Sequence, residues 1–199
     1  MIHDPLKDGI SEVELINHMG NDLTVVNAAR VSYSKESKEM TPKDAKLIRY
    51  LMRNKHGSPF EHVYFTFRVK APLYVVHQWQ RHRMASYNEE SGRYIQMQPE
   101  FYCPDKGSEE AAAHAYDIYV AKMAGGESKE SARKVLPTSL YKGFWFTVNS
   151  RSLMNFLMTR NDEHAQWEIR QYAKALESSF GAVMPTTCTA FEELGRVAP

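Results

Sequence analysis

The sequence predicts a single α+β domain (α/β in the broad sense) in which a central, mostly antiparallel sheet is flanked by long helices. Three observations favour this class. Few segments alternate polar and apolar residues as strands do, several have the periodicity of long amphipathic helices, and the two kinds do not alternate regularly along the chain. The length of 199 residues fits one domain over residues 1–199, and 43% hydrophobic residues can fill its core.

The first half of the chain is predicted to contain two strands and three helices. Residues 13–19 alternate like a short strand that Gly20 ends, and residues 62–69 alternate and are rich in β-branched and aromatic side chains. Thr41 followed by Pro42 is typical of a helix start. Comparable capping residues or prolines begin each of the three helices, which are predicted at 22–33, 41–54 and 72–82.

The second half is predicted to be mainly helical. Residues 83–107 are expected to form a loop with short extended pieces, and aromatic and β-branched residues predict one more strand at 143–150. Glycines, prolines and an Asn-Asp pair separate the remaining segments of helical periodicity. These helices are predicted at 108–123, 128–135, 152–159 and 165–180.

The charges of the chain nearly balance, because 25 lysines and arginines accompany 24 aspartates and glutamates. With a formal net charge of +1, no overall field favours nucleic acid or an anionic membrane, so any anion must bind at a local site. Cys103 and Cys188 are too few for a disulfide framework or a four-thiolate zinc site. The sequence has no recognisable leader or membrane span, and we expect a soluble, cytoplasmic protein.

Residues 81–94 hold the densest group of chemically active side chains. Three guanidiniums, two serine hydroxyls, an amide, two carboxylates and one imidazole fall within these fourteen residues. Arginine binds phosphate through two directed hydrogen bonds, and serine hydroxyls add shorter donors. The segment is therefore typical of a site for a small phosphorylated ligand, although a solvated loop with internal ion pairs has the same composition.

Further polar residues interrupt apolar stretches and need a partner in the protein or in a ligand: Arg133, Asn155 and Arg160. A structural salt bridge or a helix cap would satisfy them as well as a ligand would. Imidazole and carboxylate groups that could bind zinc or iron occur at His56, Glu61, His62, His77 and His164. Their spacing matches no zinc motif, and we expect no metal.

The 81–94 segment resembles the signature of flavin-dependent thymidylate synthases. Arg81, His82 and Arg83, followed after seven residues by Ser91, match its core, and eight fixed residues of the longer form occur within residues 81–93. Other segments resemble the family in the same order and extend the likeness over roughly residues 12–180. They are residues 21–23, 28–32, 56–62, 136–137, 152–156 and 164–168.

The resemblance implies a methyltransferase of nucleotide biosynthesis that converts dUMP to dTMP. The carbon donor would be 5,10-methylenetetrahydrofolate, the redox cofactor FAD and the reductant NADPH. The resemblance also implies a homotetramer whose active sites lie between subunits. FAD would then be held between chains, which explains why one chain lacks a dinucleotide-binding glycine motif.

The resemblance assigns two overlapping sets of site residues by position. The dUMP set comprises Gln78, Arg81, Glu89, Glu90, Ser91, Gly92, Arg93, Arg133 and Arg160. The FAD set comprises Ser58, Arg81, His82, Arg83, Glu89, Asn149, Ser150, Arg151 and Asn155, with His164 as a weaker member. Two positions depart from the family: Ser58 stands where threonine is frequent, and Glu90 where an apolar residue is common.

Arg160 is the predicted catalytic residue. A guanidinium beside the uracil would stabilise negative charge at N3 and O2, and so raise the electron density at C5, which attacks the one-carbon unit. Neither cysteine stands in a motif for a nucleophile, and Ser91 has no adjacent base, so we predict that Ser91 binds phosphate. A nucleic-acid-binding module and a metal-dependent hydrolase remain open as alternatives.

Overall fold

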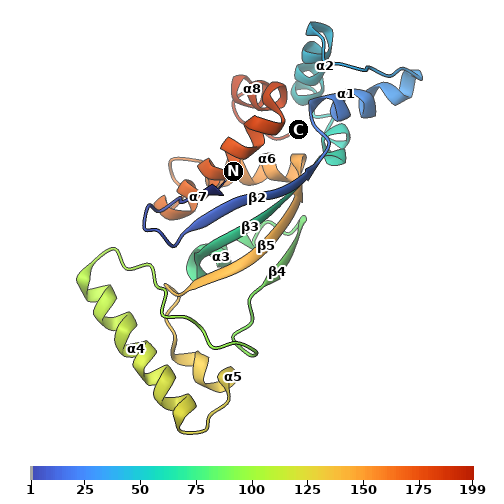
Figure 1. Cartoon of the computed structure of the whole chain (residues 1–199). Helices are drawn as coiled ribbons and strands as arrows, with labels where there is room; N and C mark the ends of the chain where they lie inside the picture. Colours follow the sequence, from blue (N-terminus) through green and yellow to red (C-terminus); the bar gives the residue numbers. More distant parts are fainter. Residues whose placement is uncertain (1) are drawn as a thin grey trace.

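The computed structural model describes residues 2–199, and its centre is an antiparallel sheet of five strands in the order β1-β2-β3-β5-β4 (Figure 1). The two longest strands, β3 and β5, lie side by side in the middle of the sheet. This architecture confirms the predicted α+β class. From β1 to β5, the strands are Ile2–His3, Glu12–Met19, Tyr64–Pro72, Ala85–Glu89 and Tyr141–Asn149.

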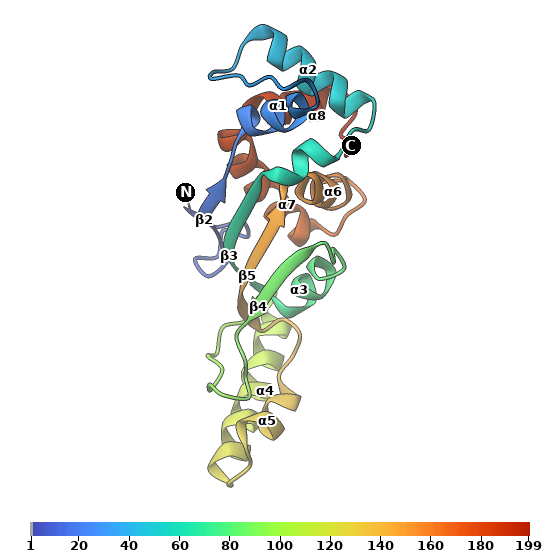
Figure 2. The ribbon, with the colours of Figure 1, turned by 90° about the vertical axis from the view of Figure 1, so that its right-hand side faces the viewer.

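The described part of the chain contains eight α-helices. In order from α1 to α8, they are Asp22–Arg30, Pro42–Arg53, Leu73–Trp79, Lys106–Ala124, Lys129–Ala132, Ser150–Arg160, Trp167–Val183 and Pro185–Glu193. Helices α3, α6 and α7 pack on one face of the sheet, α1, α2 and α8 gather at one end, and α4 and α5 extend from the other end (Figures 1 and 2). Three short 3-10 helices span Val31–Tyr33, Ser58–His62 and Arg133–Val135.

Alternation along β3 and β5 places one set of side chains in the core beneath the helices. Phe67 and Phe146 are register partners, and their ring centroids lie 6.2 Å apart. Trp79 from α3 is fully buried and packs edge-on against Phe146 at 5.4 Å. On the opposite face of the sheet, the register partners Arg68 and Trp145 are exposed. The core therefore occupies only one side of the sheet.

The α4–α5 region has a small core of its own, formed by Met97, Tyr119, Ala132 and Leu140. The main-chain amide of Met97 donates to the Tyr119 hydroxyl at 3.1 Å, which ties the loop after β4 to α4. This region extends away from the sheet (Figure 1). Among residues 2–199, no helix is both long enough and apolar enough to span a membrane.

The predicted start of α2 is confirmed by its cap. The main-chain amide of Thr41 donates to Asp44 Oδ2 at 2.9 Å, and the amide of Asp44 points back to Thr41 Oγ1 at 3.4 Å. Asp44 is fully buried and pairs with Arg30, at the end of α1, at 2.5 Å. Burial raises the pKa of Asp44, but the hydrogen bonds from Thr41 and the charge of Arg30 outweigh it and hold the pKa below its ordinary value.

Strand β4 lies inside the segment that the sequence predicts as a loop with short extended pieces. It pairs only with β5, over Ala85 to Glu89, and so forms one edge of the sheet. Most of its side chains are polar and exposed, because an edge strand has few neighbours to bury them. The apolar alternation that predicts a strand is therefore missing from this segment.

Helix α8 was not predicted at all. Its first amides are capped by Asp22, whose carboxylate accepts from the main-chain amides of Thr186 at 2.8 Å and Thr187 at 2.9 Å. Asp22 is 164 residues away in the sequence, so the cap leaves no local pattern. Helix α4 also begins two residues earlier than predicted, because Asp105 is its cap and Ser108 is the third residue of its first turn.

Candidate active site

A cavity of about 780 Å³ lies where β5 ends and α6 begins. Its walls come from residues 81–85, which lead from α3 into β4, from one side of α6, and from residues 197–199. Pockets for small molecules and cofactors typically enclose roughly 300–1,000 Å³. The cavity is therefore large enough for a nucleotide.

The cavity carries an excess of positive charge. Arg81, Arg83 and Arg160 line it, and none of them pairs with a carboxylate within residues 2–199. A fourth arginine in the wall, Arg151, pairs with Glu61 at 2.5 Å. Guanidinium groups without an acidic partner are suited to phosphate, which they bind through paired hydrogen bonds. The cavity therefore has the charge that a local anion site needs.

Arg160, the last residue of α6, is held at two points. Its Nε donates to Nε2 of His82 at 3.0 Å, and its Nη2 donates to the main-chain carbonyl of Gln78 at 2.9 Å. Gln78 lies in the last turn of α3, where carbonyls have no partner inside the helix. Burial lowers the pKa of Arg160, but a guanidinium starts from so high a value that it stays charged.

His82 is uncharged at neutral pH. Burial and the neighbouring charge of Arg160 lower its pKa from 6.5 to about 4. The unfolded chain therefore binds a proton at His82 at a higher pH than the folded chain does. As a result, this residue makes the folded state less stable as the pH falls from 6.5 towards 4.

Six residues of the predicted FAD set line the cavity: Arg81, His82, Arg83, Asn149, Arg151 and Asn155. The cavity wall does not include Ser58, Glu89, Ser150 or His164. Ser150 is fully buried, and its hydroxyl donates to the main-chain carbonyl of Phe60. Ser58 and His164 are exposed.

Local interactions shape the end of the cavity near α6. Asn149 caps α6, since its side-chain oxygen accepts from the main-chain amide of Ser152 at 2.8 Å. A Cβ on Gly57 would lie 2.4 Å from Nε of Arg151, so only glycine leaves room for that side chain. The Nε of Arg151 also donates to the main-chain carbonyl of Pro199 at 2.7 Å. Arg151 is therefore fixed by both the 57–61 segment and the carboxyl-terminal residues.

The predicted dUMP set is divided between two places. Arg81 and Arg160 line the cavity, and Gln78 contacts Arg160. The other members lie outside the cavity wall, at the far end of β4 and in the α5 region: Glu89, Glu90, Ser91, Gly92, Arg93 and Arg133. Figure 2 shows β4 running from the level of α3 towards α5. One chain does not bring the whole set together.

The second group of dUMP residues is itself closely packed. A Cβ on buried Gly92 would lie 3.1 Å from Cδ of Arg133, and Arg93 pairs with Glu130 of α5 at 3.3 Å. Glu89 and Glu90 line a separate cavity of about 280 Å³. Glu90 Oε2 accepts from the main-chain amide of Gly143, on β5, at 3.1 Å.

Part of the cavity wall lies outside the predicted site sets. Glu61 is one such residue: the sequence offers it as a possible metal ligand, and it lies within a segment that resembles the family. Met84 and Met158 supply apolar surface, and residues 197–199 close one side of the cavity. No motif marks these residues, because they reach the cavity only through the tertiary fold.

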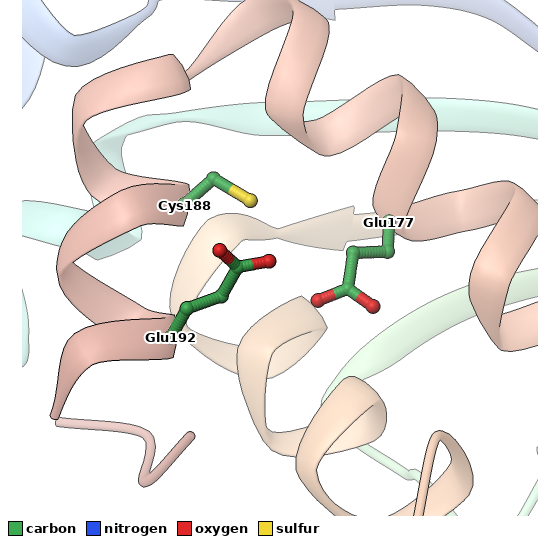
Figure 3. Close-up of side chains that lie close together, drawn as sticks. All are labelled: Glu177, Cys188 and Glu192. Carbon is green, nitrogen blue, oxygen red and sulfur yellow. The ribbon is translucent and has the colours of Figure 1, made fainter. Parts of the chain in front are cut away.

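The histidines considered as metal ligands do not assemble. His56, His62 and His77 are exposed, and they lie in a loop, in the 3-10 helix Ser58–His62 and in α3, respectively. The described residues do contain one group of possible ligands, formed by Glu177, Cys188 and Glu192 (Figure 3). Glu177, however, already pairs with Arg196 at 2.7 Å and accepts a hydrogen bond from Asn161. Burial, with nearby carboxylates, raises the pKa of the Cys188 thiol to about 11, so it is protonated at neutral pH.

Comparisons with known proteins agree on one family. The family model described as thymidylate synthase complementing protein matches residues 14–186. A flavin-dependent thymidylate synthase of Thermotoga neapolitana is 50% identical over 194 residues, which cover 90% of this chain and 89% of the relative. One from Tropheryma whipplei (strain TW08/27) is 38% identical over 100% of this chain and 99% of its own length.

A solved structure leads to the same conclusion. The crystal structure of the UMP/dUMP methylase PolB from Streptomyces cacaoi, bound with 5-Br dUMP, superposes with a TM-score of 0.90 and is 37% identical. The superposition covers 94% of this chain and 97% of that one. The family model and the relatives thus match most of the chain, including the 81–93 signature. The chain is an enzyme that belongs to the flavin-dependent thymidylate synthase family.

Proposed function

We propose that this chain methylates dUMP to dTMP with 5,10-methylenetetrahydrofolate as the carbon donor, FAD as the redox cofactor and NADPH as the reductant. The observation that carries the proposal is the cavity with three guanidiniums, of Arg81, Arg83 and Arg160, that have no carboxylate partner in the described chain. A nucleotide phosphate and an electron-rich pyrimidine are ligands that such groups stabilise. The dUMP analogue bound to the Streptomyces methylase supports dUMP as the substrate.

Arg160 is assigned to the pyrimidine. Two of its nitrogens are already bonded to His82 and Gln78, and its Nη1 has no hydrogen-bond partner within the described residues. That free group can donate to the uracil, where it would stabilise negative charge at N3 and O2. The electron density at C5 then rises, which favours attack on the one-carbon unit.

The cavity also fits FAD by the chemistry of its walls. Arg81 and Arg83 can donate to a diphosphate, and the amide of Asn155 can donate to and accept from a flavin ring. Apolar side chains, among them Met84 and Met158, supply surface for planar rings. When bound, FAD would supply the electrons that reduce the transferred one-carbon unit to a methyl group.

We further propose that the active site is completed between subunits of a homotetramer. The division of the dUMP set supports this, because the group around Gly92 and Arg93 lies outside the cavity of its own chain. A second copy could supply that group to the cavity. Exposed apolar side chains near it, Tyr94 at 72% and Trp145 at 48% exposure, are suited to such an interface. We place the enzyme in the cytoplasm, which suits its two free thiols.

Binding of the nucleotide tests the proposal. Arg81→Ala and Arg93→Ala should each weaken dUMP binding by about 2 kcal/mol, because each variant removes a charge-assisted hydrogen bond to phosphate. Isothermal titration calorimetry with dUMP and with deoxyuridine measures this effect. Arg49→Ala is the matched control, since Arg49 of α2 pairs with Glu193 of α8, lies outside the cavity wall and should not affect binding. The phosphate assignment is wrong if deoxyuridine binds as tightly as dUMP.

Flavin binding should depend on assembly. We expect absorbance at about 450 nm, typical of an oxidised flavin, to elute with an oligomer and not with a monomer. Size-exclusion chromatography with separate detection of protein and flavin absorbance measures this. Repeating it on diluted samples, in which the oligomer dissociates, shows whether the free chain still carries flavin. Flavin that elutes with a stable monomer would contradict a cofactor site shared between chains.

A further inference from the structure

We infer that His82 is a positioning residue for Arg160: its neutral imidazole and the Gln78 carbonyl together fix the plane of the guanidinium that faces the substrate. This inference rests on the proposed function of Arg160. The contact joins residues 78 positions apart, from the segment after α3 and from the end of α6. A guanidinium bonded through both Nε and Nη2 cannot rotate about its last side-chain bonds, so the position of Nη1 is set.

The direction of the hydrogen bond between Arg160 and His82 determines which nitrogen of the imidazole carries its proton. The Nε of Arg160 carries a hydrogen and can only donate, so Nε2 of His82 accepts and the ring proton lies on Nδ1. The imidazole cannot be charged in this arrangement, because both of its nitrogens would then be donors. Its burial beside the Arg160 cation keeps it neutral, as described above.

A neutral hydrogen-bond acceptor leaves the positive charge of Arg160 uncompensated, which a carboxylate would not do. An aspartate or glutamate at this point would orient the guanidinium but would also neutralise it through an ion pair. The imidazole nitrogen holds Arg160 without adding negative charge. Arg160 thus keeps its full positive charge for the anion that develops on the uracil.

His82 is itself held in place, as a positioning residue must be. Its ring centroid lies 4.7 Å from that of Phe156, one turn before Arg160 on α6. Its main-chain amide donates to the carbonyl of Trp79 at 3.0 Å, and its carbonyl accepts from the Tyr87 hydroxyl at 2.8 Å. Phe156 and Trp79 are fully buried, so the imidazole rests on the core of the domain.

Two variants of His82 distinguish the effect of its hydrogen-bond acceptor from the effect of its ring packing. His82→Phe keeps a ring against Phe156 and removes the acceptor, whereas His82→Gln offers a side-chain oxygen close to the place of Nε2. We expect His82→Phe to lower kcat for dTMP formation by about tenfold or more. His82→Gln should recover most of that loss when kcat is expressed per bound flavin. Thermal melting and size-exclusion chromatography should show that both variants remain folded and assembled.

A double-mutant cycle tests whether His82 acts through Arg160. In an Arg160→Ala background, His82→Phe should cause no further loss of kcat or of dUMP affinity measured by calorimetry. If the two losses multiply when kcat is expressed per bound flavin, His82 acts independently of Arg160 and the inference is overturned. Full activity of His82→Phe would also overturn it. Absence of dTMP formation by the wild-type enzyme would instead reject the proposed function, and the inference with it.

Discussion

Arg160→Lys is expected to lower the rate of dTMP formation by roughly a hundredfold while the enzyme keeps its fold and its flavin. Lysine retains the positive charge but not the planar fork, so it cannot bond His82, Gln78 and the uracil at once. Steady-state formation of dTMP, with flavin content determined on the same samples, measures this loss.

Arg160 also has a structural role in the fold, and Arg160→Lys can distinguish that role from the catalytic one. Its Nη2 caps the end of α3 through the Gln78 carbonyl, and lysine can cap a helix end almost as well. If capping were the whole role of Arg160, Arg160→Lys would cost little activity. Reaction of the reduced enzyme with dioxygen in the absence of folate is the control, and its rate should hardly change because the uracil takes no part. A variant that folds, retains flavin and methylates dUMP at nearly the wild-type rate would reject the catalytic role.

Asp44→Ala is expected to lower the free energy of unfolding by about 3 kcal/mol, because it leaves Arg30 without its carboxylate partner and removes the Asp44 side of the capping box of α2. Chemical denaturation of wild type and variant measures the difference. Since the pKa of Asp44 is lower in the folded chain than its ordinary 3.8, the difference should be constant above about pH 5. It should shrink as the pH falls through the range below 3.8, where the carboxylate takes up a proton.

Asp44→Asn provides the matched control for this effect. The amide oxygen can still accept from Thr41, while the charge that pairs with Arg30 is lost. This variant should therefore lose less stability than Asp44→Ala. Equal stability of wild type and Asp44→Ala at neutral pH would contradict the assigned role of the buried pair.

Much of the fold could be predicted from local sequence. The central strands carry apolar alternation because one face is buried, and α2 carries its own cap in Thr41 and Asp44. Strand β4 and helix α8 could not be predicted in the same way. The first is a polar edge strand, and the second depends on a cap from Asp22, 164 residues distant. Each requires a contact that exists only after the chain has folded.

The composition of residues 81–94 alone predicts a site for a phosphorylated ligand, and the family resemblance assigns roles to single residues. The 81–83 segment is a sequence motif, and the structure places it in the cavity wall together with Asn149, Arg151 and Asn155. No pattern in the sequence could indicate that His82 bonds Arg160 or that Arg151 bonds Glu61, because these contacts cross the fold. The segment around Gly92 is part of the same continuous motif as residues 81–83, but it lies outside the cavity wall of its own chain. The sequence motif therefore does not show that its two halves are apart in the fold.

Formation of dTMP by the purified enzyme tests the central claim most directly. The flavin-loaded protein is mixed with dUMP, 5,10-methylenetetrahydrofolate and NADPH, and the nucleotides are separated by chromatography. The account predicts that dTMP forms, and that omission of either substrate, of the reductant or of the flavin prevents it. If the flavin-loaded oligomer formed no dTMP, or if flavin-free protein formed it equally fast, the proposed function would be wrong.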